Sequence, residues 1–167
     1  NTSYNGATIS ASGSSFEMSG GAIEYNHGTS HLSVTINDKS VGSFNMNGGY
    51  IRNNTGGELG SASVSGKGAS TLLSVNTTST SKNITLSGVV ISDNEMYGSS
   101  YVNLSGGAIS VKNTVITNNR ALKYYNASGV LTSGGNAGLV AGNASTLEIS
   151  DCTINDNTAE GSTAGLN

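Results

Sequence analysis

Residues 44–54 read FNMNGGYIRNN, and this stretch contains the features that decide the fold. The apolar residues Phe44 and Met46 are separated by one polar residue, a Gly-Gly pair follows, and Ile51 stands three positions before Asn54. Alternation of this kind is typical of a β-strand with one buried face. The stretch therefore predicts two short strands that meet at a glycine corner and end in an asparagine turn.

The same arrangement occurs five times along the chain. The copies are Phe16-Met18-Ile23-Asn26, Phe44-Met46-Ile51-Asn54, Ile84-Leu86-Ile91-Asn94, Ile109-Val111-Ile116-Asn119 and Leu147-Ile149-Ile154-Asn157. They begin at residues 16, 44, 84, 109 and 147, so the spacings between them are 28, 40, 25 and 38 residues. Constant strands with connections of variable length predict a solenoid.

A further apolar segment lies between successive copies and predicts a third strand in each coil. The segments are Leu32-Val34-Ile36, Leu73-Val75, Val102-Leu104 and Leu139-Ala141. Residues 56–70 and 121–138 are rich in Gly, Ser and Asn and lack regular alternation. We expect both intervals to be irregular loops at one corner of the coil.

These observations predict an all-β fold, a parallel β-helix of about five to six coils with three strands per coil. We assign a right-handed coil because crossovers between parallel strands almost always have that hand. Residues 1–167 are expected to form a single β-helix domain. No capping element is visible at either end, which predicts a segment of a longer chain or a subunit that stacks end to end.

The asparagine at the end of each copy predicts a ladder along one corner of the coil. The five members are Asn26, Asn54, Asn94, Asn119 and Asn157. A side-chain amide can both donate a hydrogen bond and accept one, so stacked asparagines can satisfy one another and the buried turn groups around them.

Composition excludes several classes of function. The net charge of -3 gives no basic surface for nucleic acid, and no apolar run reaches the length of a membrane span. The single Cys152 excludes an internal disulfide and is expected to be a small filler near a turn. A chain poor in Cys and charge and rich in Ser, Thr and Asn is typical of bacterial surface proteins. We therefore expect an extracellular, cell-surface or secreted location.

Two short motifs support this location through a resemblance. The sequence Ser-Gly-Gly-Ala-Ile occurs at residues 19–23 and 105–109, and Ile-x-x-Asn occurs in every coil. With these motifs the chain resembles the polymorphic outer-membrane proteins and related β-helical adhesins. Residues 44–55 also resemble repeats in very large surface proteins of gut bacteria. The resemblance implies a β-helix used for adhesion or as a structural stalk, and it carries over no catalytic residue.

Alignment of the copies converts sequence positions into columns on the coil surface, with neighbours about 4.8 Å apart. Glu17 and Glu148 share one column but lie four coils apart, too far for the paired carboxylates of glycoside hydrolysis. Glu24 and Arg52 are neighbours in another column, which predicts an exposed ion pair between coils.

In a third column, Asp93, Asn118 and Asp156 form a continuous run of acidic and amide residues. These side chains are candidate Ca²⁺ ligands, with Asp151 nearby in the adjoining turn. They also resemble the acidic groove of carbohydrate-active β-helices, although Lys112, a candidate basic partner, has a different position in the repeat. The alternative is that Asp and Asn serve here only as turn residues.

Two remaining groups of residues offer weaker sites. His27 and His31 lie close together in the sequence but have no third ligand for zinc, so we expect ordinary turn residues. Tyr124 and Tyr125 lie in the longest loop, where exposed aromatic rings can stack on sugars or contact a protein partner. The alternative is a loop that folds back on the rod.

The leading hypothesis is a noncatalytic surface module, an adhesin or structural β-helix that presents binding loops to a protein or glycan on a host or neighbouring cell. The second is a carbohydrate-active β-helix, lyase-like or hydrolase-like, that uses the acidic column. The third is a self-assembling extracellular filament subunit that associates end to end. We expect no enzyme activity, no cofactor apart from the candidate Ca²⁺ ion, and neither nucleic-acid binding nor membrane insertion.

Overall fold

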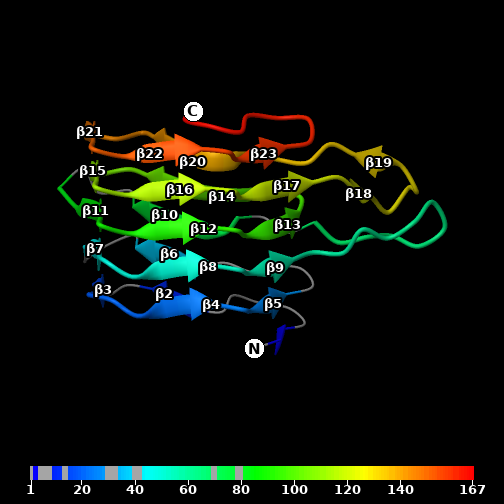
Figure 1. Ribbon diagram of the computed structural model, residues 1–167, viewed down its shortest axis with the longest axis horizontal. Coiled ribbons are helices and arrows are strands. Elements are labelled where there is room, and N and C mark those ends of the chain that lie inside the picture. The colour runs from blue at the N-terminus through cyan, green and yellow to red at the C-terminus, as the bar shows by residue number, and fades with distance from the viewer. Residues whose placement is uncertain are drawn as a thin grey trace.

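The computed structural model describes residues 2–3, 9–12, 15–28, 34–38, 43–68, 71–77 and 81–167, with the backbone alone for 2–3, 9–12 and 34–38. All regular structure in these residues is β. The strands form four parallel sheets, A to D, which the chain visits in turn (Figure 1). None of the described residues belongs to a helix that could cross a membrane.

Each sheet takes one strand from each successive pass of the chain. Sheet A contains β1 (Thr2–Ser3), β5 (His27–Gly28), β9 (Thr55–Gly56), β13 (Glu95–Tyr97), β17 (Arg120–Leu122) and β23 (Thr158–Ala159). Sheet B contains β2 (Ile9–Ser12), β6 (Val34–Asp38), β10 (Leu73–Thr77), β14 (Ser100–Ser105) and β20 (Ala137–Gly142). Sheet C contains β3 (Phe16–Met18), β7 (Phe44–Asn47), β11 (Asn83–Ser87), β15 (Ala108–Lys112) and β21 (Thr146–Ser150). Sheet D contains β4 (Ala22–Glu24), β8 (Tyr50–Arg52), β12 (Val90–Ser92), β16 (Val115–Thr117) and β22 (Thr153–Asn155).

Stacked parallel sheets of this kind fit the predicted parallel β-helix. Figure 1 shows the strands of sheets D and A one above another, from β4 and β5 near the N-terminus to β22 and β23 near the C-terminus. An antiparallel hairpin of β18 (Tyr124–Tyr125) and β19 (Leu131–Thr132) interrupts the path between β17 and β20.

The register of the sheets confirms the alignment of the five copies. In sheet C the first apolar position pairs in the order Phe16, Phe44, Ile84, Ile109 and Leu147. In sheet D the isoleucines pair in the order Ile23, Ile51, Ile91, Ile116 and Ile154. The third predicted segment forms sheet B, where Val34, Leu73, Val102 and Leu139 are in register, while Leu32 lies outside the described residues.

The prediction of three strands per coil is wrong, because sheet A adds a fourth strand after each ladder asparagine. Its strands are only two or three residues long, and β13 and β17 each place one residue inward, Met96 and Ala121, both 0% exposed. The two Ser-Gly-Gly-Ala-Ile motifs also prove not to be equivalent. Ile23 belongs to sheet D, whereas Ile109 belongs to sheet C.

The core consists of the inward side chains of the four sheets. In β14, Val102 and Leu104 are fully buried, whereas Tyr101 and Asn103 between them are half-buried and face outward. Phe16 and Phe44 stack on successive strands with their ring centroids 5.1 Å apart. Alternate residues thus form a continuous apolar column, and burial of this surface is the main stabilising contribution.

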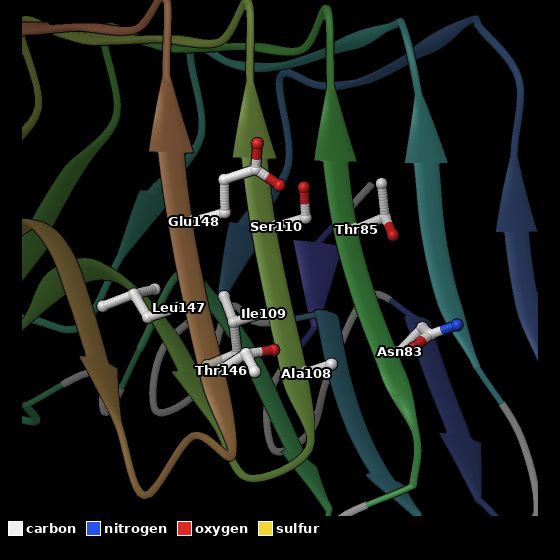
Figure 2. Close-up of a pocket in the computed structure, with 8 residues that line it drawn as sticks. All are labelled: Asn83, Thr85, Ala108, Ile109, Ser110, Thr146, Leu147 and Glu148. Atoms are coloured by element: carbon white, nitrogen blue, oxygen red, sulfur yellow. The ribbon is translucent and has the colours of Figure 1, made fainter.

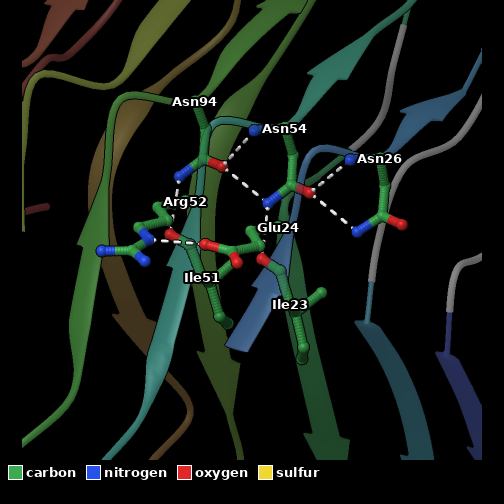
Figure 3. Close-up of polar contacts among 7 residues, drawn as sticks. All are labelled: Ile23, Glu24, Asn26, Ile51, Arg52, Asn54 and Asn94. Atoms are coloured by element: carbon green, nitrogen blue, oxygen red, sulfur yellow. Dashed lines mark hydrogen bonds and ion pairs between the residues drawn. The ribbon is translucent and has the colours of Figure 1, made fainter. Parts of the chain in front are cut away.

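The predicted asparagine ladder is present at the corner between sheets D and A. Each Nδ2 donates to the Oδ1 of the next asparagine along the series Asn26, Asn54, Asn94, Asn119 and Asn157, at 2.9, 2.9, 2.8 and 2.9 Å. The same Oδ1 atoms accept the backbone N–H groups of the preceding members, as Figure 3 shows for the first three. Asn54, Asn94 and Asn119 are at most 1% exposed, so the ladder replaces water for these turn groups.

Candidate functional site

Two long connections leave the same corner, where the chain passes from sheet A to sheet B. The first follows β9, and its residues Glu58 and Lys67 pair as in an antiparallel hairpin, as do Ser61 and Val64. The second contains the β18–β19 hairpin, closed by Asn126, whose Oδ1 accepts the N–H groups of residues 128 and 130. We call residues 57–68 and 123–135 together the paired loops. Figure 1 shows both on the same side of the rod.

The paired loops contact each other directly. The N–H of Tyr125 donates to the carbonyl of Leu59 at 2.8 Å, and the N–H of Gly66 donates to the carbonyl of Tyr125 at 2.7 Å. A glycine makes the closest approach possible, because a β-carbon at Gly68 would lie 2.6 Å from the ring of Tyr124. Two connections that lie on different coils therefore form one projection.

The projection exposes four large aliphatic side chains. Leu59 and Val64 of the first loop are 43% and 64% exposed, and Val130 and Leu131 of the second are 57% and 46% exposed. Because both loops of the projection contribute such side chains, the projection is a candidate contact site for another molecule. The composition of the two loops predicts their position but not these residues, because a few aliphatic residues in a Gly/Ser-rich segment form no periodic pattern.

Tyr124 and Tyr125 lie where the two paired loops meet. Both are half-buried within the projection. The ring of Tyr124 lies over Gly68, and the backbone of Tyr125 joins the two loops. These contacts favour the alternative in which the loop folds back, although it folds onto its neighbouring loop. A partner contact by these two tyrosines stays a prediction.

The acidic column is explained by backbone conformation. Asp93, Asn118 and Asp156 have φ angles of 57°, 54° and 53°, in the left-handed region that Asn and Asp tolerate best. Asp151 has the same conformation at another corner, with φ of 53°. All four side chains are exposed. In the described part of the chain, no three His, Cys, Asp or Glu side chains gather closely enough to hold a metal ion, so Ca²⁺ binding stays a prediction.

Among the described residues, three ion pairs join neighbouring coils on the outer surface. The predicted pair of Arg52 Nε and Glu24 Oε2 is confirmed at 2.7 Å, and Figure 3 shows it beside the ladder. Arg120 Nη1 lies 2.6 Å from Glu95 Oε2. The third joins Lys112 and Glu148 at 2.8 Å, which gives Lys112 a partner away from the acidic column. Pairs this exposed contribute little to stability.

A shallow hollow of about 250 Å³ lies on sheet C, along β11, β15 and β21. Figure 2 shows Thr85, Ser110 and Glu148 in a row across these strands, with Asn83 and Thr146 at another level. Its only titratable side chain is Glu148, which is paired with Lys112. The hollow thus offers hydroxyl and amide groups for hydrogen bonding but no second carboxylate for acid–base chemistry.

Two isolated residues have ordinary local contacts. The Nδ1 of His27 lies 2.8 Å from the Oγ1 of Thr55 on the next strand, and His31 lies outside the described residues. Cys152 is half-buried and its thiol donates to the carbonyls of Ser150 and Val111. The prediction of a turn residue is wrong for His27, which lies in β5 and pairs with Thr55 of β9, whereas the contacts of Cys152 agree with a small filler.

No family model, curated protein or solved structure matches the chain.

Proposed function

We propose that this protein is a noncatalytic extracellular β-helix module, an adhesin or stalk segment, whose paired loops bind a protein partner on a neighbouring surface. The observation that carries the proposal is the projection of two loops joined by backbone hydrogen bonds, with four exposed aliphatic side chains. Exposed aliphatic surface favours a protein partner, because specific protein interfaces have an apolar centre.

The rod supplies the rigid base for this site. We propose the right-handed coil that parallel crossovers favour, with about five to six coils. The coils hold the paired loops at fixed points, because the first loop follows β9, the second follows β17, and β13 pairs with both strands in sheet A. Binding loops on a rigid scaffold are a common arrangement, because the scaffold limits the ordering cost of binding.

The test is adhesion of beads coated with the protein to an epithelial cell layer, with and without removal of the surface proteins by protease. A variant with Ser at residues 59, 64, 130 and 131 should lose adhesion while its thermal midpoint stays unchanged. The matched control is Leu166→Ser, which alters a side chain of similar exposure, 55%, away from the paired loops. Equal adhesion of the loop variant and the unmodified protein would contradict the proposal. Adhesion that survives protease but not glycan removal would indicate a glycan ligand.

A second candidate is end-to-end self-association. One observation favours it: Leu147 in β21 is 49% exposed, whereas its register partner Ile109 is 1% exposed. β21 and β22 are edge strands of sheets C and D, and such edges can pair with strands of another molecule. Mass photometry over a range of concentrations tests this. Rods whose mass grows with concentration would support it, and monomers throughout would exclude it.

A further inference from the structure

Tyr25 occupies a backbone conformation that its residue type disfavours. Its φ of 53° places it in the left-handed region, and of the eight non-glycine residues with positive φ in the described part of the chain, the other seven are Asn or Asp. The equivalent positions in later coils are Asn53, Asp93, Asn118 and Asp156, which tolerate this conformation. Tyr25 is also 69% exposed, so burial of its ring does not offset the strain. Strain held at an exposed aromatic residue points to a role in binding.

Three neighbouring side chains complete a surface cluster beside Tyr25. In sheet D, Glu24 pairs with Arg52 of the next strand, and Tyr50 lies two residues before Arg52 on the same outward face. The guanidinium carbon of Arg52 lies 4.5 Å from the centroid of the Tyr50 ring, and Tyr50 is 43% exposed. The Nε of Arg52 donates a hydrogen bond to Glu24 Oε2 at 2.7 Å. Arg52 is therefore fixed from two sides.

Tyr25 directly follows Glu24 at the end of β4, so its backbone is adjacent to the residue that binds Arg52. The pKa of Arg52 is raised, chiefly by the hydrogen bond from its guanidinium to Glu24, with smaller electrostatic contributions from Glu24, Tyr25 and Tyr50. Tyr25 thus belongs to the same cluster as Tyr50, although it lies at the corner beyond the strand.

The chemistry of the cluster selects a neutral ligand that is rich in hydroxyl groups. The opposite charges of Glu24 and Arg52 cancel, so neither an anion nor a cation is favoured. Arg52 retains guanidinium N–H donors beyond its Nε, and Glu24 retains carboxylate lone pairs as acceptors. The exposed ring of Tyr25 offers a flat apolar face. A sugar ring has the matching features, namely one face of C–H groups and a rim of hydroxyls that both donate and accept.

We propose that Tyr25, Tyr50, Arg52 and Glu24 form a binding site for a neutral sugar residue of a glycan, separate from the paired loops. Tyr25 stacks on the sugar ring, and Arg52 and Glu24 hydrogen-bond to its hydroxyls. Tyr50 positions Arg52.

The test is an NMR titration of the protein with five neutral oligosaccharides, namely cellohexaose, maltohexaose, xylohexaose, mannohexaose and chitohexaose, and with a polygalacturonate oligomer as the acidic probe. We expect at least one neutral probe to shift the signals of the Tyr25 ring and the Arg52 side chain. The acidic probe should leave them in place. If none of the five neutral probes shifts these signals, the proposal is overturned.

Tyr25→Asn is the decisive variant, because its expected effects on binding and stability have opposite signs. Loss of one aromatic contact should weaken binding about tenfold. Relief of the left-handed strain should raise the thermal midpoint by about 2–4 °C. Weaker binding by a more stable protein cannot come from misfolding. Unchanged binding of the same probe by this variant would refute the role of Tyr25.

Two further variants distinguish a specific sugar site from general effects of backbone strain and of charge. Asn118→Tyr places a tyrosine at the equivalent left-handed position away from Arg52, and should lower the thermal midpoint without adding a second site. Glu24→Gln leaves the charge of Arg52 unbalanced and should shift preference toward the acidic probe. If Glu24→Gln leaves the preference unchanged, the ion pair does not set specificity and that part of the proposal is wrong.

Discussion

Replacement of Asn94 by alanine should be among the most destabilising single changes in the rod. Asn94 is 0% exposed. Its Oδ1 accepts the N–H and Nδ2 of Asn54 at 3.0 and 2.9 Å, and its Nδ2 donates to Asn119 Oδ1 at 2.8 Å and to the carbonyl of Ile51 at 3.0 Å. Alanine removes all four hydrogen bonds at once and leaves the buried N–H of Asn54 without this acceptor.

The expected loss follows from these contacts. A buried donor left without an acceptor costs about 1–3 kcal/mol, and each of the other hydrogen bonds contributes about 0.5–1.5 kcal/mol. Because such contributions are not strictly additive, we expect Asn94→Ala to lower the free energy of unfolding by about 3–6 kcal/mol. This is a large part of the roughly 5–15 kcal/mol that stabilises a typical domain.

Urea unfolding followed by far-ultraviolet circular dichroism measures this loss. The matched control is Asn83→Ala, which removes an exposed asparagine from β11 and should change the free energy of unfolding by less than about 0.5 kcal/mol. A loss for Asn94→Ala below about 1 kcal/mol, close to the control, would refute the role of the ladder.

Three other expectations concern the same framework. Gly106→Ala should destabilise the protein by about 1–3 kcal/mol more than Gly88→Ala in urea unfolding. Both glycines have positive φ, but only a β-carbon at Gly106 would overlap the backbone of the neighbouring coil. Burial raises the pKa of Tyr101, so the folded state holds the phenol proton more tightly than the unfolded state does. The free energy of unfolding should therefore fall as the pH rises above about 10, and the Tyr101→Phe variant should lack this dependence. The coupling free energy between Glu95 and Arg120 in a double-mutant cycle should be at most about 1 kcal/mol. It should be smaller in 1 M salt, because the electrostatic screening length there is only about 3 Å.

The sequence predicted the parts of the fold whose signal repeats in every coil. The alternating apolar positions of sheets B, C and D and the ladder asparagines lie in the expected register because each inward side chain must meet an equivalent one above and below. Sheet A was missed because strands such as β5 and β9 have two residues and place only a glycine inward, Gly28 and Gly56.

The features that the sequence did not predict depend on local backbone conformation or on contacts between residues far apart in the sequence. Asp93 and its neighbours in the acidic column fit both a left-handed turn and a metal site, because the left-handed region and cation binding favour the same residue types. The paired loops join through backbone atoms of Leu59 and Tyr125, which no side-chain pattern reports. The strained conformation of Tyr25 is likewise visible only when its φ angle is known.

The central claim is that stacked coils enclose a hydrogen-bonded asparagine ladder. Hydrogen exchange of the side-chain amides, measured by NMR on the unmodified protein, tests it most directly. We predict that the Nδ2 protons of Asn54, Asn94 and Asn119 exchange far more slowly than those of exposed Asn83, because each donates to an Oδ1 and to a backbone carbonyl. Exchange of the three ladder amides as fast as that of Asn83 would contradict the account.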